Sequence, residues 1–372
     1  MNRLAFERPE LIDPLLERAR SGAPLLLAGP PGSGKTTLLQ ALAAALAREG
    51  FAVVSLDLMG AASSPERFVQ AALGSLPAER FASRMADALE IHRLSAAGRT
   101  HGAAAVQALF ALWASLDDAG GRPVALLLDE ATEIRSLAYF AGLRDVAKPF
   151  AETLRARRRG TILATSFPTQ AAKLWDFERL DVPPLEAAHL APFVSAGEAE
   201  QILRASHGWA RYARILIEAL RASGSVAAAW ANEMSPGGRL ETACRATYES
   251  LLLRSRGYGI SKALLAMIAH EEGQNLTAIY REIGRSPGAT RDYLGWLLNV
   301  DAVRMVKKRY YYVDGLVRRW VRLYGRGRLP TASEIDAAAR ELLASETSPA
   351  TASAQAEAPG PRDRHETLME ID

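Results

Sequence analysis

The sequence predicts an α/β fold in which helices cover both faces of a parallel sheet, followed by a helical region and a small C-terminal domain. Three observations support this. Short apolar strands alternate with helical stretches through the first half of the chain. These strands are continuously apolar, as expected for a sheet buried on both faces. From residue 198 onwards the pattern is helical, until an alternating segment near residue 310 predicts a hairpin.

The first half of the chain predicts five strands and the helices between them. An amphipathic helix is expected over the first twenty residues, and a strong helix follows the first strand at residues 35–48. A longer helical stretch, with a weak break around residues 96–102, is expected at 65–116, and a further helix should run through Arg157. The predicted strands are residues 24–29, 51–58, 123–130, 160–166 and 180–185.

The second half predicts a change of architecture after a loop at residues 187–197. Four helical segments follow, and then three short helices and a hairpin in the order of a winged helix-turn-helix. Ser286 and Pro287 form a helix-start signal for the third of these helices. We therefore expect an α/β core (1–190), a helical lid (191–256), a winged helix-turn-helix (257–328), and a helix with a disordered acidic tail (329–372).

Composition excludes several classes of protein. The single cysteine, Cys244, cannot form an internal disulfide and fits a reducing compartment. No apolar run approaches the roughly 20 residues of a membrane span, and the six histidines show no metal-ligand spacing. The expectation is a cytoplasmic protein without structural zinc.

The segment GPPGSGKT matches the phosphate-loop pattern G-x-x-x-x-G-K-[ST] between a strand and a helix. Its backbone N–H groups and the helix N-terminus would hold the phosphates of a nucleoside triphosphate, which we take to be ATP. Lys35 would reach the β- and γ-phosphates, and the Thr36 hydroxyl would bind Mg²⁺. The predicted nucleotide-binding residues of the loop are Gly29, Pro30, Pro31, Gly32, Ser33, Gly34, Lys35, Thr36 and Thr37.

An acidic pair follows the third predicted strand. Asp129 would bind Mg²⁺ together with Thr36, and Glu130 would polarise the attacking water. The second carboxylate favours hydrolysis over binding alone. The alternative is that Asp129 and Glu130 belong to a surface turn without a functional role.

Other polar residues occupy places where they could assist hydrolysis. Thr165 and Ser166 end the fourth strand, and either could contact the γ-phosphate or orient water, although strand-end capping is the alternative. Of the two we take Thr165 as the catalytic candidate. Arg179, just before the last predicted strand, could act in a neighbouring copy's site. The basic run 155–159 competes with it for that role. Arg211 could contact the γ-phosphate from the lid, and Arg214, about one turn on, is the alternative.

In this order the motifs resemble those of the AAA+/STAND ATPases, specifically the archaeal-type ATPases with a C-terminal winged helix. FERPEL is similar to an N-terminal element that passes near the adenine in that family, which implies nucleotide contact for Arg8. HGWARY is similar to the family's lid motif but lacks its usual proline. The resemblance covers about residues 5–325 and implies an AAA+-like P-loop core, a lid and a winged helix.

Charge is concentrated near the C-terminus. Residues 301–328 hold nine basic and two acidic side chains, a net charge of +7, while the tail is acidic. The winged helix could therefore bind duplex DNA, or it could pack on the core or on a protein partner. The candidate DNA contacts are Arg285, Arg291, Lys307, Lys308 and Arg309.

Together these features predict an ATP-hydrolysing switch whose nucleotide state moves the lid and winged helix. The alternatives are a DNA-loading, initiator or transposition-helper ATPase, a defence or stress signalling ATPase with a protein partner, and a nucleotide binder without turnover. A homo-oligomer is expected if Arg179 acts in trans.

Overall fold

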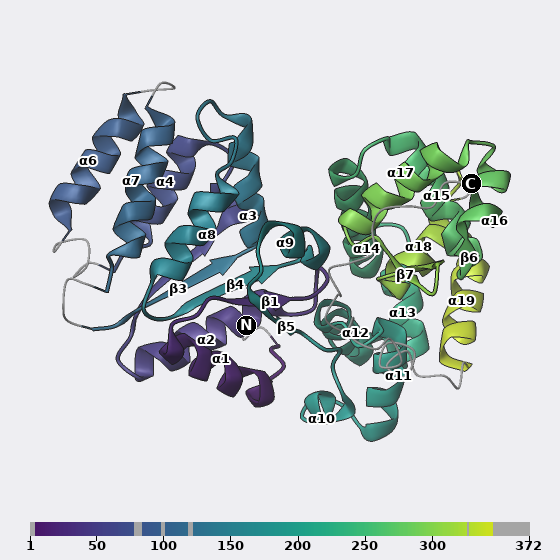
Figure 1. Ribbon diagram of the computed structural model, residues 1–372. Coiled ribbons are helices and arrows are strands. Elements are labelled where there is room, and N and C mark those ends of the chain that lie inside the picture. The colour runs from purple at the N-terminus through teal and green to yellow at the C-terminus, as the bar shows by residue number, and fades with distance from the viewer. Residues whose placement is uncertain (1–3, 78–83, 98–100, 118–121, 326, 345–372) are drawn as a thin grey trace.

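A computed structural model describes residues 4–77, 84–97, 101–117, 122–325 and 327–344. The predicted acidic tail lies outside these ranges. A five-stranded parallel sheet forms the N-terminal half, and helices with a small second sheet form the C-terminal half (Figure 1). The expected fold class is confirmed. None of the described helices is long and apolar enough to cross a membrane.

The N-terminal half alternates strands and helices. Its elements are α1 (Pro9–Ser21), β1 (Leu25–Ala28), α2 (Lys35–Arg48), β2 (Ala52–Asp57), α3 (Leu58–Ala61), α4 (Pro65–Gly74), α6 (Met85–Ala96), α7 (Gly102–Ala114), β3 (Val124–Asp129), the 3-10 helix η1 (Ala131–Tyr139), α8 (Ala147–Ala156), β4 (Thr161–Thr165), α9 (Pro168–Leu174) and β5 (Glu178–Asp181).

The strand order is β2-β3-β4-β1-β5. Strand β4 therefore lies between β1, which leads into the phosphate loop, and β3, which ends at the acidic pair. Ala28 of β1 is in register with Thr165 of β4, so the loops after these strands meet at one edge of the sheet. Such an edge is where parallel α/β sheets bind ligands.

Both faces of the sheet are covered, because successive β1 side chains enter different cores. Leu25 and Leu27 pack with α1 and α2, whereas Leu26 packs with α3, α4, α7 and α8 on the opposite face (Figure 1). This is why the strands are continuously apolar.

The C-terminal half begins with helices where the lid was expected. Its elements are α10 (Ala187–Leu190), α11 (Ala196–Ser206), α12 (Ala210–Ser223), α13 (Val226–Met234), α14 (Arg239–Arg254), α15 (Tyr258–His270), β6 (Gln274–Asn275), α16 (Leu276–Ile283), α17 (Pro287–Asn299), β7 (Val303–Val306), β8 (Arg309–Tyr312), α18 (Gly315–Tyr324) and α19 (Ala332–Ala344).

Residues 258–312 have the layout of a winged helix. Ser286 caps α17, and β7 and β8 form an antiparallel hairpin to which β6 adds a third strand. Lys307 and Lys308 form the hairpin turn, and both have positive φ angles, as such turns require.

A single hydrophobic core joins the lid helices, the winged helix and α19. It runs from Leu190 and Tyr212 through Leu252 and Leu294 to Leu342. The lid and winged helix are therefore packed together as one body rather than as two separate ones.

Four sequence predictions of local structure differ from the structure. The last strand is Glu178–Asp181 rather than 180–185, so Arg179 lies inside it. The expected loop at 187–197 contains α10, which is capped by Glu186 and His189. The stretch 65–116 is divided into α4, α6 and α7; the predicted break around 96–102 agrees with the end of α6 and the start of α7, whereas the division between α4 and α6 was not predicted. The region before Arg157 is divided into η1 and α8. Apolar periodicity predicts where helices occur more reliably than where they are interrupted.

Candidate functional site

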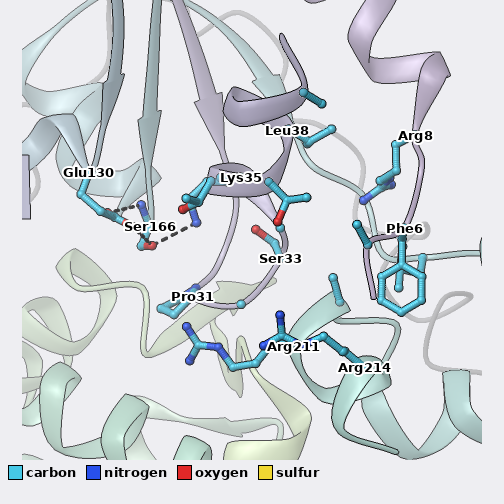
Figure 2. A pocket seen from close by; sticks show the side chains of 18 of the residues that line it. Phe6, Arg8, Pro31, Ser33, Lys35, Leu38, Glu130, Ser166, Arg211 and Arg214 are labelled. Atoms are coloured by element: carbon cyan, nitrogen blue, oxygen red, sulfur yellow. Dashed lines mark hydrogen bonds between the residues drawn. The ribbon is translucent and has the colours of Figure 1, made fainter. Parts of the chain in front are cut away.

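A cavity of about 660 Å³ lies between the phosphate loop, the N-terminal segment and the lid helices α12 and α14 (Figure 2). All of the predicted phosphate-loop residues from Pro31 to Thr37 line it. Gly29 and Pro30 do not, but their backbone carbonyls accept hydrogen bonds from Lys35 Nζ. The loop therefore lies at the edge of the sheet where a ligand is expected.

Positive φ angles at Gly32 (88°) and Gly34 (103°) shape the phosphate loop, a conformation that other residues rarely adopt. Ser33 is buried, and its Oγ has no hydrogen-bond partner among the residues described. An orphaned polar atom in such a loop fits a site completed by a polar ligand.

Lys35 turns into the protein at the start of α2. Its Nζ donates to the carbonyls of Gly29 (2.9 Å) and Pro30 (3.1 Å) and to Ser166 Oγ (3.0 Å). Burial lowers the pKa of Lys35, although Glu130 and Asp129 act in the opposite direction. The ammonium group is thus held where the loop would present it to phosphate.

Thr36 and Asp129 meet across the edge of the sheet. Thr36 Oγ1 donates a 2.5 Å hydrogen bond to Asp129 Oδ2, and Asp129 ends β3. A hydroxyl and a carboxylate in contact are oxygen ligands of the kind that Mg²⁺ prefers. The pair fits the predicted metal-binding role.

Glu130 adopts an unusual backbone conformation, with φ 46° and ψ 48°. Such a conformation in a residue other than glycine often accompanies function. Its carboxylate accepts hydrogen bonds from the Ser166 backbone N–H and from Ser166 Oγ. Burial raises the pKa of Glu130, and Asp129 adds to the rise, while Lys35 and Ser166 oppose it. A carboxylate with a raised pKa next to a cation is a suitable general base.

Of the two polar residues that end β4, only Ser166 lines the cavity. It connects Lys35 to Glu130 by hydrogen bonds (Figure 2). Thr165, the residue assigned a catalytic role from sequence, is fully buried and bonds Thr132 Oγ1 at 3.0 Å. Strand alternation explains this difference, because neighbouring residues point in opposite directions.

Arg211 and Arg214 reach the cavity from α12 (Figure 2). The Arg211 backbone N–H donates to Gly32 O at 2.9 Å, so the lid touches the phosphate loop directly. A Cβ atom at Gly32 would lie 3.0 Å from the Arg211 side chain. Both arginines therefore line the cavity, and contact of either one with a γ-phosphate stays a prediction.

Arg8 lines the opposite end of the cavity and is almost fully buried. It donates to the carbonyls of Pro183 (2.9 Å) and Pro184 (3.5 Å), in the segment between β5 and the lid. Burial lowers the pKa of Arg8, and Glu10 partly offsets that effect. Phe6 lies beside it.

Arg179 does not line this cavity. Its guanidinium pairs with Asp181 on the exposed edge strand β5. Within the competing basic run, Arg155 pairs with Asp176. Arg157 is buried and donates to the carbonyls of Trp113 and Val124. Arg157 therefore anchors structure and is not a candidate for reaching another chain.

Sequence reasoning missed the part of the cavity formed by Met59 and by one face of α14. The α14 residues are Ala246, Thr247, Ser250 and Leu251. They lie far from the phosphate loop in sequence, and no motif marks them. Only the packing of the lid brings them to the site.

The predicted DNA-contacting residues lie on the winged helix, and all five side chains are exposed. Arg285 precedes α17, Arg291 lies on it, and Lys307 and Lys308 form the wing turn. Arg309 donates to Gly273 O at 2.6 Å. None of the five has an ion pair among the described residues.

Several arginines of the basic segment 301–328 are instead paired with acidic residues. Arg318 pairs with Glu272 at 2.8 Å, Arg319 and Arg322 approach Glu341 of α19, and Arg328 pairs with Glu334. The +7 charge seen in the sequence is thus partly neutralised in the fold.

Comparisons with known proteins agree with this architecture. A family model described as the AAA ATPase domain matches residues 7–147. A Walker-type ATPase of Pyrococcus abyssi superposes with a TM-score of 0.63 at 18% identity, covering 86% of this chain and 96% of that one. No curated protein gives a significant match.

Weaker structural similarities extend to replication proteins. The ORC2 protein of Aeropyrum pernix gives a TM-score of 0.45 at 15% identity, covering 92% of this chain and 95% of that chain. DnaA from Aquifex aeolicus gives 0.35 at 14% identity, covering 77% and 85%. The family match thus places an AAA ATPase domain at residues 7–147, and the Pyrococcus abyssi structure shares the fold of the chain.

Proposed function

We propose that this chain is an ATP-hydrolysing switch that converts the state of its nucleotide into movement of the lid and winged helix. ATP would bind in the cavity, with its phosphates on the loop at 29–36 and Mg²⁺ held by Thr36 and Asp129. Glu130 would accept a proton from the attacking water, and Lys35 would stabilise phosphate charge. Ser166 replaces Thr165 as the strand-end residue that would sense the γ-phosphate.

One pair of neighbouring residues supports the switch most directly. Arg211 contacts the phosphate loop through its backbone N–H. The next residue, Tyr212, donates from its hydroxyl to Asp314 Oδ2 at 2.7 Å, and Asp314 caps α18 behind the wing. A ligand that displaces α12 from the loop would therefore also move the winged helix.

The shared core suggests how the lid and winged helix would move. Because it joins α11 to α19, the lid and winged helix would swing together. The hinge would lie at Pro183 and Pro184, where Arg8 holds the backbone. On this proposal the chain after the hinge, beginning at Leu185 and Leu190 of the shared core, would move as one body in place of an independent lid and winged helix.

A nucleotide-dependent change of shape tests the switch. Labels on the core and on α19 would report the distance between the two bodies with ATP and with ADP in Mg²⁺. The switch predicts a different distance in the two states, and Glu130→Gln should hold the ATP distance. Equal distances in both states, with hydrolysis intact, would refute the switch and leave the ATPase assignment standing.

Action on duplex DNA is a second candidate, favoured by the unpaired basic residues of α17 and the wing turn. ATPase activity and size-exclusion behaviour would be measured with and without duplex DNA at low and high salt. DNA stimulation that is lost at high salt supports a DNA-loading, initiator or transposition-helper role. Absence of any DNA effect at low salt would favour a signalling ATPase with a protein partner. Assembly with ATP that is lost in Arg179→Ala would support a homo-oligomer.

A further inference from the structure

A second cleft, of about 1190 Å³, lies between the core and the winged helix. One wall is formed by η1, α8 and α9 of the core, and the other by the end of α14 and by α17. Arg254 Nη2 bonds Glu133 Oε1 at 2.9 Å, and Lys173 Nζ bonds Asn299 Oδ1 at 2.7 Å. These contacts join the two walls of the cleft in this structure.

The cleft is strongly basic. Its lining holds seven cationic side chains against the carboxylates of Glu133 and Asp145. Five of those cations have no ion pair among the described residues, namely Arg135, Arg144, Lys148, Lys173 and Arg256. Arg135 and Lys173 bond only amide oxygens. The cleft is therefore complementary to a polyanion.

Two aromatic side chains face the same space. Tyr139, at the end of η1, is 94% exposed, which is unusual for so large a ring. Trp296 of α17 lines the opposite wall, with the Arg256 guanidinium 5.9 Å from its ring centre. Gly295 leaves open space beside it, because a Cβ there would meet nothing within 4 Å.

Cations that bind phosphates and aromatic faces that stack on unpaired bases are the combination used by single-strand binding sites. An acidic peptide would contact the cations but not the aromatic rings. The bases of a duplex are paired and stacked on each other, so they cannot stack on these rings. We infer that this cleft binds a single-stranded nucleic acid, with the phosphates on Arg144 and Lys148 and bases on Tyr139 and Trp296. The site differs from the wing and does not depend on ATP hydrolysis.

Fluorescence anisotropy of a labelled oligothymidylate, without nucleotide, tests this inference. The double variant Arg144→Ala/Lys148→Ala should weaken binding and lower the slope of log K against log salt by about 1.4. Tyr139→Ala should weaken binding roughly 5- to 150-fold, and Tyr139→Trp should restore it. Gly295→Leu should also weaken binding, because it fills the cleft without changing charge.

The matched control is Arg221→Ala/Lys262→Ala, which removes two exposed cations, on α12 and α15, that line neither cavity and should leave oligothymidylate binding unchanged. Binding unaffected by the cleft variants, or weakened as much by this control, would overturn the inference. Polyglutamate serves as a competitor. If polyglutamate displaces the oligothymidylate only when Arg144 and Lys148 are present, and Tyr139→Ala does not weaken oligothymidylate binding, the cleft would instead bind an acidic protein segment. Since ATP is absent, failure here leaves the proposed ATPase untouched.

Discussion

The nucleotide cavity and the basic cleft differ in how far apart their residues lie in the sequence. The part of the cavity that would hold phosphates is one contiguous loop, Pro31 to Thr37, with Glu130 beside it, whereas its other lining residues come from the N-terminal segment and the lid helices. The cleft takes its residues from five elements, η1, α8, α9, α14 and α17, and from the segments beside them, between residues 132 and 299. A site that binds its ligand through the backbone N–H groups of successive residues leaves a contiguous motif in the sequence. A site assembled from single side chains is visible only after folding.

The largest expected effect concerns the cavity. Glu130→Gln should lower kcat for ATP hydrolysis by roughly 10²- to 10⁴-fold, because it removes the general base. ATP affinity should change little, since Lys35 and the loop remain. Steady-state ATPase rates and equilibrium nucleotide binding would measure the two effects. Glu152→Gln, an exposed position on α8, is the control. Hydrolysis at the normal rate would show that another group activates the water.

The second prediction concerns the contact between the lid helix α12 and the start of α18. Tyr212→Phe deprives buried Asp314 of a hydrogen-bond donor and should lower the free energy of unfolding by about 1–3 kcal/mol. Urea denaturation would measure it. Tyr310→Phe is the control, since it alters a buried tyrosine of the wing. An unchanged unfolding free energy would mean that this hydrogen bond does not tie the two parts together.

The third prediction tests whether a basic residue that pairs with an acidic residue in the fold still contributes to DNA binding. Arg318→Ala should cost about 0.5–1 kcal/mol of stability, because the ion pair with Glu272 is partly exposed. It should leave duplex binding unchanged, whereas Lys308→Ala should weaken it if the wing contacts DNA. Thermal denaturation and duplex titrations would measure both. A large loss of duplex binding in Arg318→Ala would show that the basic segment acts as a whole.

The smallest effect concerns a contact between the core and the winged helix. Asp301 accepts from Thr169 N at 3.1 Å and Thr169 Oγ1 at 2.5 Å, and burial raises the pKa of Asp301 to about 6. A carboxyl whose pKa is raised on folding binds more protons in the folded state. Its contribution to stability is therefore full below pH 4 and is lost as pH rises through 6.

Asp301→Asn should remove that pH dependence and slightly stabilise the protein at pH 7.5. Asparagine also tolerates the positive φ of 52° at this position. Urea unfolding of both proteins at pH 4.5, 6.0 and 7.5 would measure the difference. A constant difference across the range would mean that Asp301 does not titrate there.

Much of the fold could be predicted because its signals are local. Apolar runs marked the strands β1 to β4, and Ser286 with Pro287 marked the start of α17. The strand β5 was misplaced because it is an exposed edge strand, ERLD, without an apolar run. Thr165 was preferred over Ser166 because which of two neighbours faces a ligand depends on strand orientation. The pairing of Arg318 with Glu272 depends on tertiary packing and has no sequence signal.

Because the lid and winged helix share one hydrophobic core, we expect them to unfold together. Tyr212, Leu252, Leu294 and Leu342 belong to one apolar cluster, so the helices from α11 to α19 should protect their amides from hydrogen exchange as one cooperative unit. A chain cut after residue 256 would expose the inner face of its own lid. The winged helix is therefore part of the folding unit that completes the nucleotide cavity, and it cannot be removed as a separate module.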